Sequence, residues 1–142
     1  MYTYPWSALC LQTLAYLAPL ITQLQQRLAQ PGVNPKTQNP ARSGRPLPDL
    51  HGVVVAPSHE LSIQIMHMAQ QLLDPGLRDK VQQMIGSASP ARQREAVKRH
   101  RPWLLVGTPG RLLDMIHKGV IDVDRCPLLV LDEVGLSLII LK

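Results

Sequence analysis

Two adjacent carboxylates follow an apolar run near the end of the 142-residue chain, where Asp132 and Glu133 come directly after Pro127–Leu131. Such a run predicts a buried parallel strand, and open α/β sheets bind ligands at the carboxyl ends of their strands. An aspartate there can hold Mg²⁺, and a following glutamate can orient or deprotonate a water that attacks a phosphate. The alternative is a solvated strand end, because acidic pairs are common at such positions.

Three further apolar runs each end in a turn or cap signal, and they predict strands at Gly52–Ala56, Val81–Ile85 and Trp103–Gly107. Helical patterns lie between them. Ser58 is an expected N-cap, and Ser89-Pro90 and Thr108-Pro109 are expected to start two more helices. The first of these helices is expected to bury one face made of Leu61, Ile65, Met68 and Leu72.

The alternation of strands and helices predicts βαβ crossovers and an α/β fold with a parallel sheet and flanking helices. The polar residues that follow each strand then fall on one edge of that sheet.

These residues resemble the DEAD-box RNA helicases. Pro57–Gln64 is similar to the family's Pro-Thr-Arg-Glu-Leu-Ala-x-Gln motif, and Thr108–Leu112 contains its Thr-Pro-Gly-Arg motif. Gly86-Ser87 stands where the family has a Gly-Gly pair, and Val130–Glu133 matches the start of Val-Leu-Asp-Glu-Ala-Asp. The motifs occur in the family's order and spacing.

The resemblance implies an incomplete RecA-like domain of the P-loop NTPase type across residues 1–142, which would use ATP and Mg²⁺ to remodel RNA. It implies that Glu133 is catalytic, that Thr13 and Asp132 contact the nucleotide, and that Asp132 holds Mg²⁺. The implied RNA contacts are Pro57, His59, Gly86, Thr108, Gly110 and Arg111.

The chain departs from the family at the phosphate loop. Thr13–Leu20 resembles the helix after that loop, but Ala8–Thr13 stands in place of Thr-Gly-Ser-Gly-Lys-Thr. Both glycines and the lysine are replaced, by Leu9, Leu11 and Gln12, so the backbone amides and the charge that hold a phosphate are lost. We therefore expect weak ATP binding.

Other departures are His59 in place of an arginine and Gly135 in place of the motif's last aspartate. The family's Ser-Ala-Thr motif and second RecA-like domain have no counterpart in the chain. The resemblance therefore covers most of this chain but only part of one domain.

The charge of the chain favours a polyanionic partner. Lysine and arginine number 15 against 10 acidic residues, for a formal net charge of +5. A basic cluster contains Arg92, Arg94, Lys98, Arg99, His100 and Arg101. This composition suits RNA bound without base specificity, although a solvated helix face explains the cluster equally well. Aromatic residues are 4% of the chain and phenylalanine is absent, which argues against a stacking platform.

The composition also bears on the compartment. Cys10 and Cys126 lack metal-ligand spacing and are expected to be reduced core residues. No run predicts a transmembrane helix or an ordinary signal peptide. We expect an intracellular protein, with no membrane contact, that weakly resembles plant organellar members of the family.

Two segments stand apart from the predicted domain. Residues 30–49 form a proline-rich basic stretch that predicts a surface loop. Residues 136–142 form an apolar tail with no counterpart in the family, through which the chain is expected to self-associate.

Three interpretations remain open. The chain can be the ATP-binding domain of an ATP-dependent RNA helicase, which is a hydrolase acting on ATP. It can be a non-catalytic RNA-binding remnant, or a truncated splice product. The altered phosphate loop predicts that the isolated chain is inactive.

Overall fold

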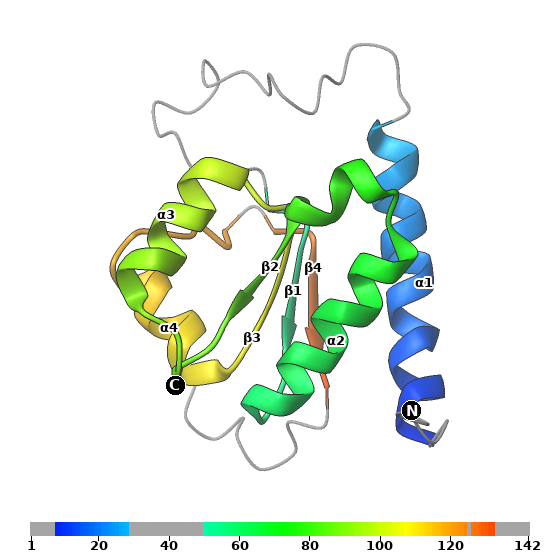
Figure 1. The fold of residues 1–142 in the computed structure, drawn as a ribbon, viewed down its shortest axis with the longest axis horizontal. Coiled ribbons are helices and arrows are strands. Elements are labelled where there is room, and N and C mark those ends of the chain that lie inside the picture. The colour runs from blue at the N-terminus through cyan, green and yellow to red at the C-terminus, as the bar shows by residue number, and fades with distance from the viewer. Residues whose placement is uncertain (1–7, 29–49, 125, 133–142) are drawn as a thin grey trace.

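A four-stranded parallel sheet forms the centre of the computed structural model (Figure 1). The structure describes residues 8–28, 50–124 and 126–132. The strands are β1 (Gly52–Val55), β2 (Val81–Met84), β3 (Leu104–Gly107) and β4 (Leu128–Leu131), in the order β2-β3-β1-β4. Each strand coincides with a predicted run to within one residue at either end, and the predicted α/β parallel sheet is confirmed.

Helices cover both faces of the sheet (Figure 1). On one face lie α1 (Ala8–Leu28) and α2 (His59–Leu72), and on the other lie α3 (Pro90–His100) and α4 (Pro109–His117). A 3₁₀ helix, η2 (Pro75–Lys80), leads into β2. Within the described ranges, none of the helices is both long and apolar enough to cross a membrane.

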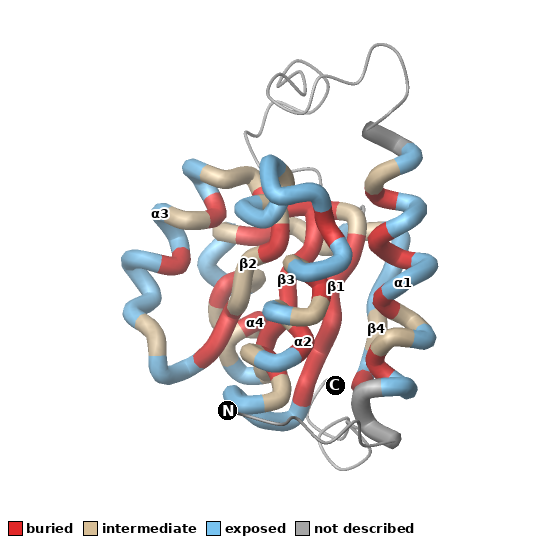
Figure 2. The backbone as a smooth tube through the Cα atoms, turned by 45° about the vertical axis from the view of Figure 1, so that its right-hand side comes forward, coloured by how far each residue is buried: buried red, intermediate tan, exposed pale blue. Residues whose placement is uncertain are grey.

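The core consists of two apolar clusters, one on each face of the sheet. Figure 2 shows the buried residues along the central strands β1 and β3. Alternate residues of β1 supply them: Val54 faces α1 and α2, whereas Val53 and Val55 face α3 and α4. This alternation is the two-residue period of a strand. Because helices cover both faces, β1 and β3 are buried along their whole length.

Capping explains where α2 begins, but its buried face differs from the prediction. The Ser58 hydroxyl accepts a hydrogen bond from the Leu61 amide at 3.1 Å, as expected of an N-cap. The buried residues of α2 are Ser62, Ile65 and Ala69. Of the predicted face only Ile65 is fully buried, and Leu72 is exposed. The prediction missed two small side chains, which allow the helix to pack closely against the sheet.

The strand β4 was predicted to be buried, and this was wrong. Leu128, Leu129 and Leu131 are exposed, with 62% of Leu129 accessible. The strand lies at an edge of the sheet and pairs with β1. Val130 is the β4 residue that packs against the cluster under α1 and α2. The predicted loop at 30–49 and tail at 136–142 lie outside the described residues, so self-association through the tail stays a prediction.

Gly107 allows β3 to lie close to β2 at the carboxyl end of the sheet. A Cβ atom at this position would lie 2.4 Å from the Met84 carbonyl oxygen and 2.8 Å from the Met84 Cβ. The same carbonyl accepts a hydrogen bond from the Thr108 amide at 3.0 Å. A side chain at Gly107 must therefore displace backbone that is already hydrogen-bonded.

We predict that Gly107→Ala lowers the free energy of unfolding by about 1–3 kcal/mol, the usual cost of overpacking a rigid site. Urea denaturation followed by circular dichroism measures this. Gly76→Ala is the matched control, because no atom lies within 4 Å of a Cβ placed there. Equal midpoints for the two variants would show that the β2–β3 contact tolerates a methyl group.

Candidate functional site

The turns that follow the four strands meet at one edge of the sheet. Backbone hydrogen bonds connect each strand end to its neighbour: Thr108 N–H donates to Met84, Ala56 N–H to Gly107, and Asp132 N–H to Val55. The parallel strands thus bring together turns that lie far apart in the sequence.

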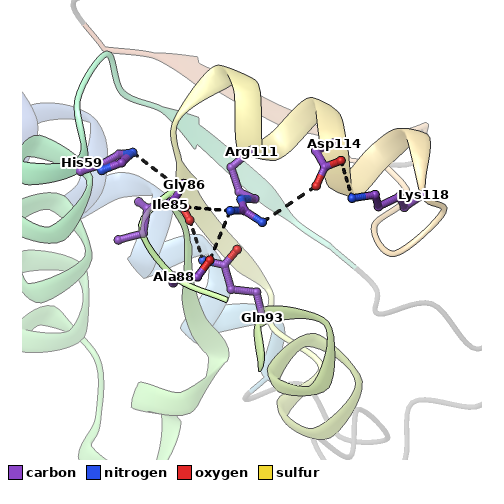
Figure 3. A network of polar contacts seen from close by, with 8 residues as sticks. All are labelled: His59, Ile85, Gly86, Ala88, Gln93, Arg111, Asp114 and Lys118. Carbon is purple, nitrogen blue, oxygen red and sulfur yellow. Dashed lines mark hydrogen bonds and ion pairs between the residues drawn. The ribbon is translucent and has the colours of Figure 1, made fainter. Parts of the chain in front are cut away.

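A hydrogen-bonded network centred on Gly86 joins three of these turns (Figure 3). The Gly86 amide donates to Nε2 of His59, at 3.3 Å. On the other side, Nη2 of Arg111 donates to the carbonyls of Gly86 and Ala88, at 2.9 and 3.2 Å. Residues on α2 and α4 therefore hold the loop between β2 and α3 from opposite sides.

A third helix also supports this loop. Gln93 on α3 is buried, and its Nε2 donates to the Ile85 carbonyl at 3.0 Å. The Ile85 carbonyl and the Gly86 amide belong to the same peptide unit, so this bond fixes the direction of the Gly86 N–H. Asp114 adds a weaker constraint through its 3.9 Å ion pair with Arg111.

The predicted RNA-contact residues gather at this edge but differ in exposure. Pro57, His59, Gly86 and Gly110 are exposed, and Thr108 is half-buried. The Arg111 side chain is only 10% exposed. Its guanidinium supports the loop backbone, a role that the sequence motif did not indicate.

A second cluster surrounds Asp132, at the end of β4. The carboxylate is buried, and its Oδ2 accepts a hydrogen bond from the Tyr16 hydroxyl at 2.7 Å. Thr13 is also buried and hydrogen-bonds to Tyr16. Sequence reasoning missed Tyr16, although it follows Thr13 by three residues and therefore lies on the same face of α1.

The Tyr16 hydroxyl is held in its neutral form. Burial raises the pKa of Tyr16 well above its ordinary value, and the hydrogen bond and negative charge of Asp132 raise it further. The bond to Thr13 lowers this pKa, by less than the other effects raise it.

The segment that aligns with the phosphate loop is helical. Residues 8–13 form the start of α1, in which Leu11 and Gln12 are exposed. A helical backbone does not provide the convergent amides of a phosphate loop, and Gln12 carries no charge. Thr13 and Asp132 supply a hydroxyl and a carboxylate suited to Mg²⁺. The described residues do not fit the phosphates of a nucleoside triphosphate, because they supply neither convergent amides nor a positive charge there. In the described part of the chain, no three His, Cys, Asp or Glu residues cluster to hold a metal, and Glu133 lies outside that part.

Comparison with known proteins decides the ancestry of this arrangement. The DEAD/DEAH box helicase family model matches residues 12–138. The chain belongs to the DEAD/DEAH box helicase family. The matched range excludes Ala8–Leu11 and takes in the first three residues of the 136–142 segment.

Individual relatives agree with this assignment. The chain is 38% identical, over 123 residues, to the mitochondrial DEAD-box ATP-dependent RNA helicase 47 of Arabidopsis thaliana. The alignment covers 87% of this chain and 21% of that protein. The chain therefore spans about a fifth of this curated relative.

Solved structures share the fold. The yeast DEAD-box splicing factor Prp28 superposes with a TM-score of 0.66 at 22% identity, over 84% of this chain and 25% of that one. Mss116p bound to single-stranded RNA and AMP-PNP gives a TM-score of 0.64 at 22% identity, over 84% of this chain and 22% of its own. The predicted RecA-like fold is confirmed.

We predict that Tyr16→Phe destabilises the protein at neutral pH by about 1.5–3 kcal/mol, because the buried Asp132 carboxylate loses a hydrogen bond. The raised pKa of Tyr16 adds a pH dependence. Folding favours the neutral hydroxyl, so this stabilisation is complete below the ordinary value of 10.0 and is lost as the pH rises above it.

Urea midpoints at neutral pH and above about pH 10 test both effects. The wild-type protein should lose more stability on alkalinisation than Tyr16→Phe does. In a double-mutant cycle, Asp132→Asn should reduce the cost of Tyr16→Phe at neutral pH. Additive effects of the two substitutions would contradict a direct interaction.

Proposed function

We propose that this chain binds the sugar–phosphate backbone of single-stranded RNA at the carboxyl edge of its sheet, without reading the bases. The observation that carries the proposal is the network joining His59, Gly86 and Arg111, which holds three turns with family motifs in one fixed surface. The relatives are named as RNA helicases, which supports RNA as the ligand.

The exposed groups of the site favour contacts with the RNA backbone over contacts with the bases. Its exposed residues, Pro57, His59, Gly86 and Gly110, offer amides, an imidazole and little side-chain bulk. Trp103 is buried and contributes no stacking surface. Groups of this kind position a phosphate backbone but carry no sequence information.

The basic helix α3 adds positive charge next to this site. It begins at Pro90, shortly after the Gly86–Ala88 loop, and exposes Arg92, Arg94, Lys98 and Arg99. Such charges raise the local concentration of a polyanion and make its binding sensitive to salt.

In this proposal Arg111 acts mainly on the shape of the site. Its side chain is largely buried and its Nη2 donates to two loop carbonyls. It keeps the Gly86–Ala88 loop in the conformation that presents its amides, and it adds positive charge beneath the loop.

The family's use of ATP and Mg²⁺ suggests a second candidate function, an ATP-binding domain within an ATP-dependent RNA helicase. The contacts linking Thr13, Tyr16 and Asp132 favour it, because a hydroxyl and a carboxylate suited to Mg²⁺ are held together. Against activity of this chain stand the helical segment at residues 8–13 and the neutral Gln12. We therefore propose that RNA binding without turnover of ATP is the better description of what this chain does by itself.

The name of the Arabidopsis relative places that protein in mitochondria. We propose an organellar location for this chain as well. Imaging of a fluorescent fusion in cells stained for mitochondria tests it, and an even distribution through the cell would contradict it.

We predict that the chain binds labelled single-stranded RNAs of equal length and different sequence with similar affinity. The affinity should fall steeply with salt, by about 0.7 logarithmic units per phosphate contact for each tenfold rise in salt. Arg111→Ala should weaken binding to every sequence by about tenfold, because the loop that presents the amides loses the charge-assisted hydrogen bonds that hold its conformation.

Fluorescence anisotropy measures these affinities. Arg78→Ala is the matched control, because Arg78 is exposed on η2, which precedes β2 and lies toward the opposite edge of the sheet. Equal losses for the two variants would point to general electrostatics instead of a site at the carboxyl edge.

We further predict that ATP–Mg²⁺ binds weakly and is not turned over. Calorimetric titration and a phosphate-release assay with saturating RNA test this. RNA-stimulated phosphate release that disappears in Glu133→Gln would overturn it and favour the second candidate function.

A further inference from the structure

The contact between His59 and Gly86 depends on the protonation of the imidazole. The Gly86 N–H donates to Nε2 of His59 at 3.3 Å. This nitrogen accepts a hydrogen bond only in the neutral ring that carries its proton on Nδ1. In the protonated ring both nitrogens carry hydrogen, so two donors would face each other.

The Gly86 amide is not free to turn away from this conflict. The peptide unit to which it belongs is held through its other end, the Ile85 carbonyl, by the buried Gln93. The next carbonyl along, that of Gly86, is held by Arg111. The repulsion between the two donors after protonation is therefore relieved by movement of the exposed imidazole. This movement leaves the Gly86 N–H without its acceptor.

The imidazole lies directly against the Gly86 backbone. A Cβ on Gly86 would lie 3.3 Å from Nε2 of His59, so a larger residue at position 86 would push the exposed ring aside by a few tenths of an ångström. Both residues are exposed, so a ligand can reach the amide and the ring from solvent.

In the described part of the chain, the surrounding charges provide no carboxylate partner for a protonated His59. Glu60 follows it on α2, and across the loop α4 contributes Arg111 and its partner Asp114. Asp132, at the end of β4, is buried and bonded to Tyr16. The loop from Gly86 to Ser89 has no titratable side chain. Among the described residues, no ion pair joins His59 to an acidic group.

We propose that His59 and the Gly86 amide form a proton-gated binding site for one phosphate of the RNA backbone. When His59 is neutral, its Nε2 accepts the hydrogen bond of the Gly86 amide, so the amide cannot bind a phosphate and the site is closed. When His59 is protonated, the imidazolium and the freed N–H both donate to a phosphate oxygen. This proposal rests on the proposed RNA function and deepens it, because it makes RNA binding at this edge coupled to proton uptake.

The sign of the coupling follows from the charges. A phosphate binds the protonated form, so RNA affinity rises as the pH falls through the range in which histidines titrate, between about pH 5 and 8. By linkage, bound RNA favours protonation of His59 to the same extent.

Anisotropy titrations of labelled single-stranded RNA at constant ionic strength, from about pH 8 down to pH 5.5, test the gate. The wild-type chain should gain about tenfold in affinity, the effect of one charge-assisted contact. His59→Gln should bind weakly, with a much smaller gain, and His59→Arg should bind tightly at every pH. His67→Gln, which removes another exposed histidine from α2, should behave as wild type.

A second measurement follows the gate without RNA. In ¹⁵N-resolved NMR spectra of the free chain, the Gly86 amide shift should titrate together with the His59 ring. In His59→Gln the Gly86 amide shift should remain constant with pH. The dispersion of the same spectra reports whether that variant is folded.

Two results would overturn the gate: a Gly86 amide that does not respond to His59, or a full pH gain retained in His59→Gln. A responding Gly86 amide with no RNA binding at any pH would overturn the proposed function, and with it the phosphate as ligand. The failure of the gate and the failure of the proposed function are thus distinguishable.

Discussion

Parallel pairing of β3 with both β1 and β2 is the constraint on which the site depends. It places the carboxyl ends of the strands side by side, and backbone hydrogen bonds from Thr108, Ala56 and Asp132 hold each end to its neighbour. The close approach at Gly107 is part of this arrangement, because the Met84 carbonyl reaches the Thr108 amide past a residue without a side chain. Motifs separated in the sequence become one surface only because these ends are level.

The surface is then stiffened by polar side chains from the helices. Gln93 and Arg111 hydrogen-bond to loop carbonyls from the side of α3 and α4, while His59 accepts from a loop amide on the side of α2. The Arg111 guanidinium thus hydrogen-bonds to the loop backbone. The exposed groups that can contact a ligand are amides and an imidazole. Fixing these groups in advance reduces the entropy that binding must overcome.

Much of the fold could be predicted from the sequence, since short apolar runs, Ser58 and the proline pairs mark local boundaries. The exposure of β4 could not, because the apolar run Pro127–Leu131 has the same composition whether a strand lies inside a sheet or at its edge. The Tyr16–Asp132 bond joins residues 116 positions apart, so no local pattern indicates it. The family motif located Arg111 at the site, but it does not indicate that the side chain turns inward. The roles of Pro57, His59, Gly86, Thr108, Gly110, Thr13 and Asp132 as ligand contacts remain predictions.

The edge position of β4 has a consequence for how the protein opens. β4 pairs with β1, and three of its four leucine and valine side chains are exposed. Amide hydrogen exchange should therefore be fastest, among the four strands, in β4, because less apolar surface opposes its local unfolding. Asp132 ends this strand, and its bond to Tyr16 anchors it to α1. The Tyr16 hydroxyl thereby adds to the backbone pairing with β1 in opposing detachment of the end of β4.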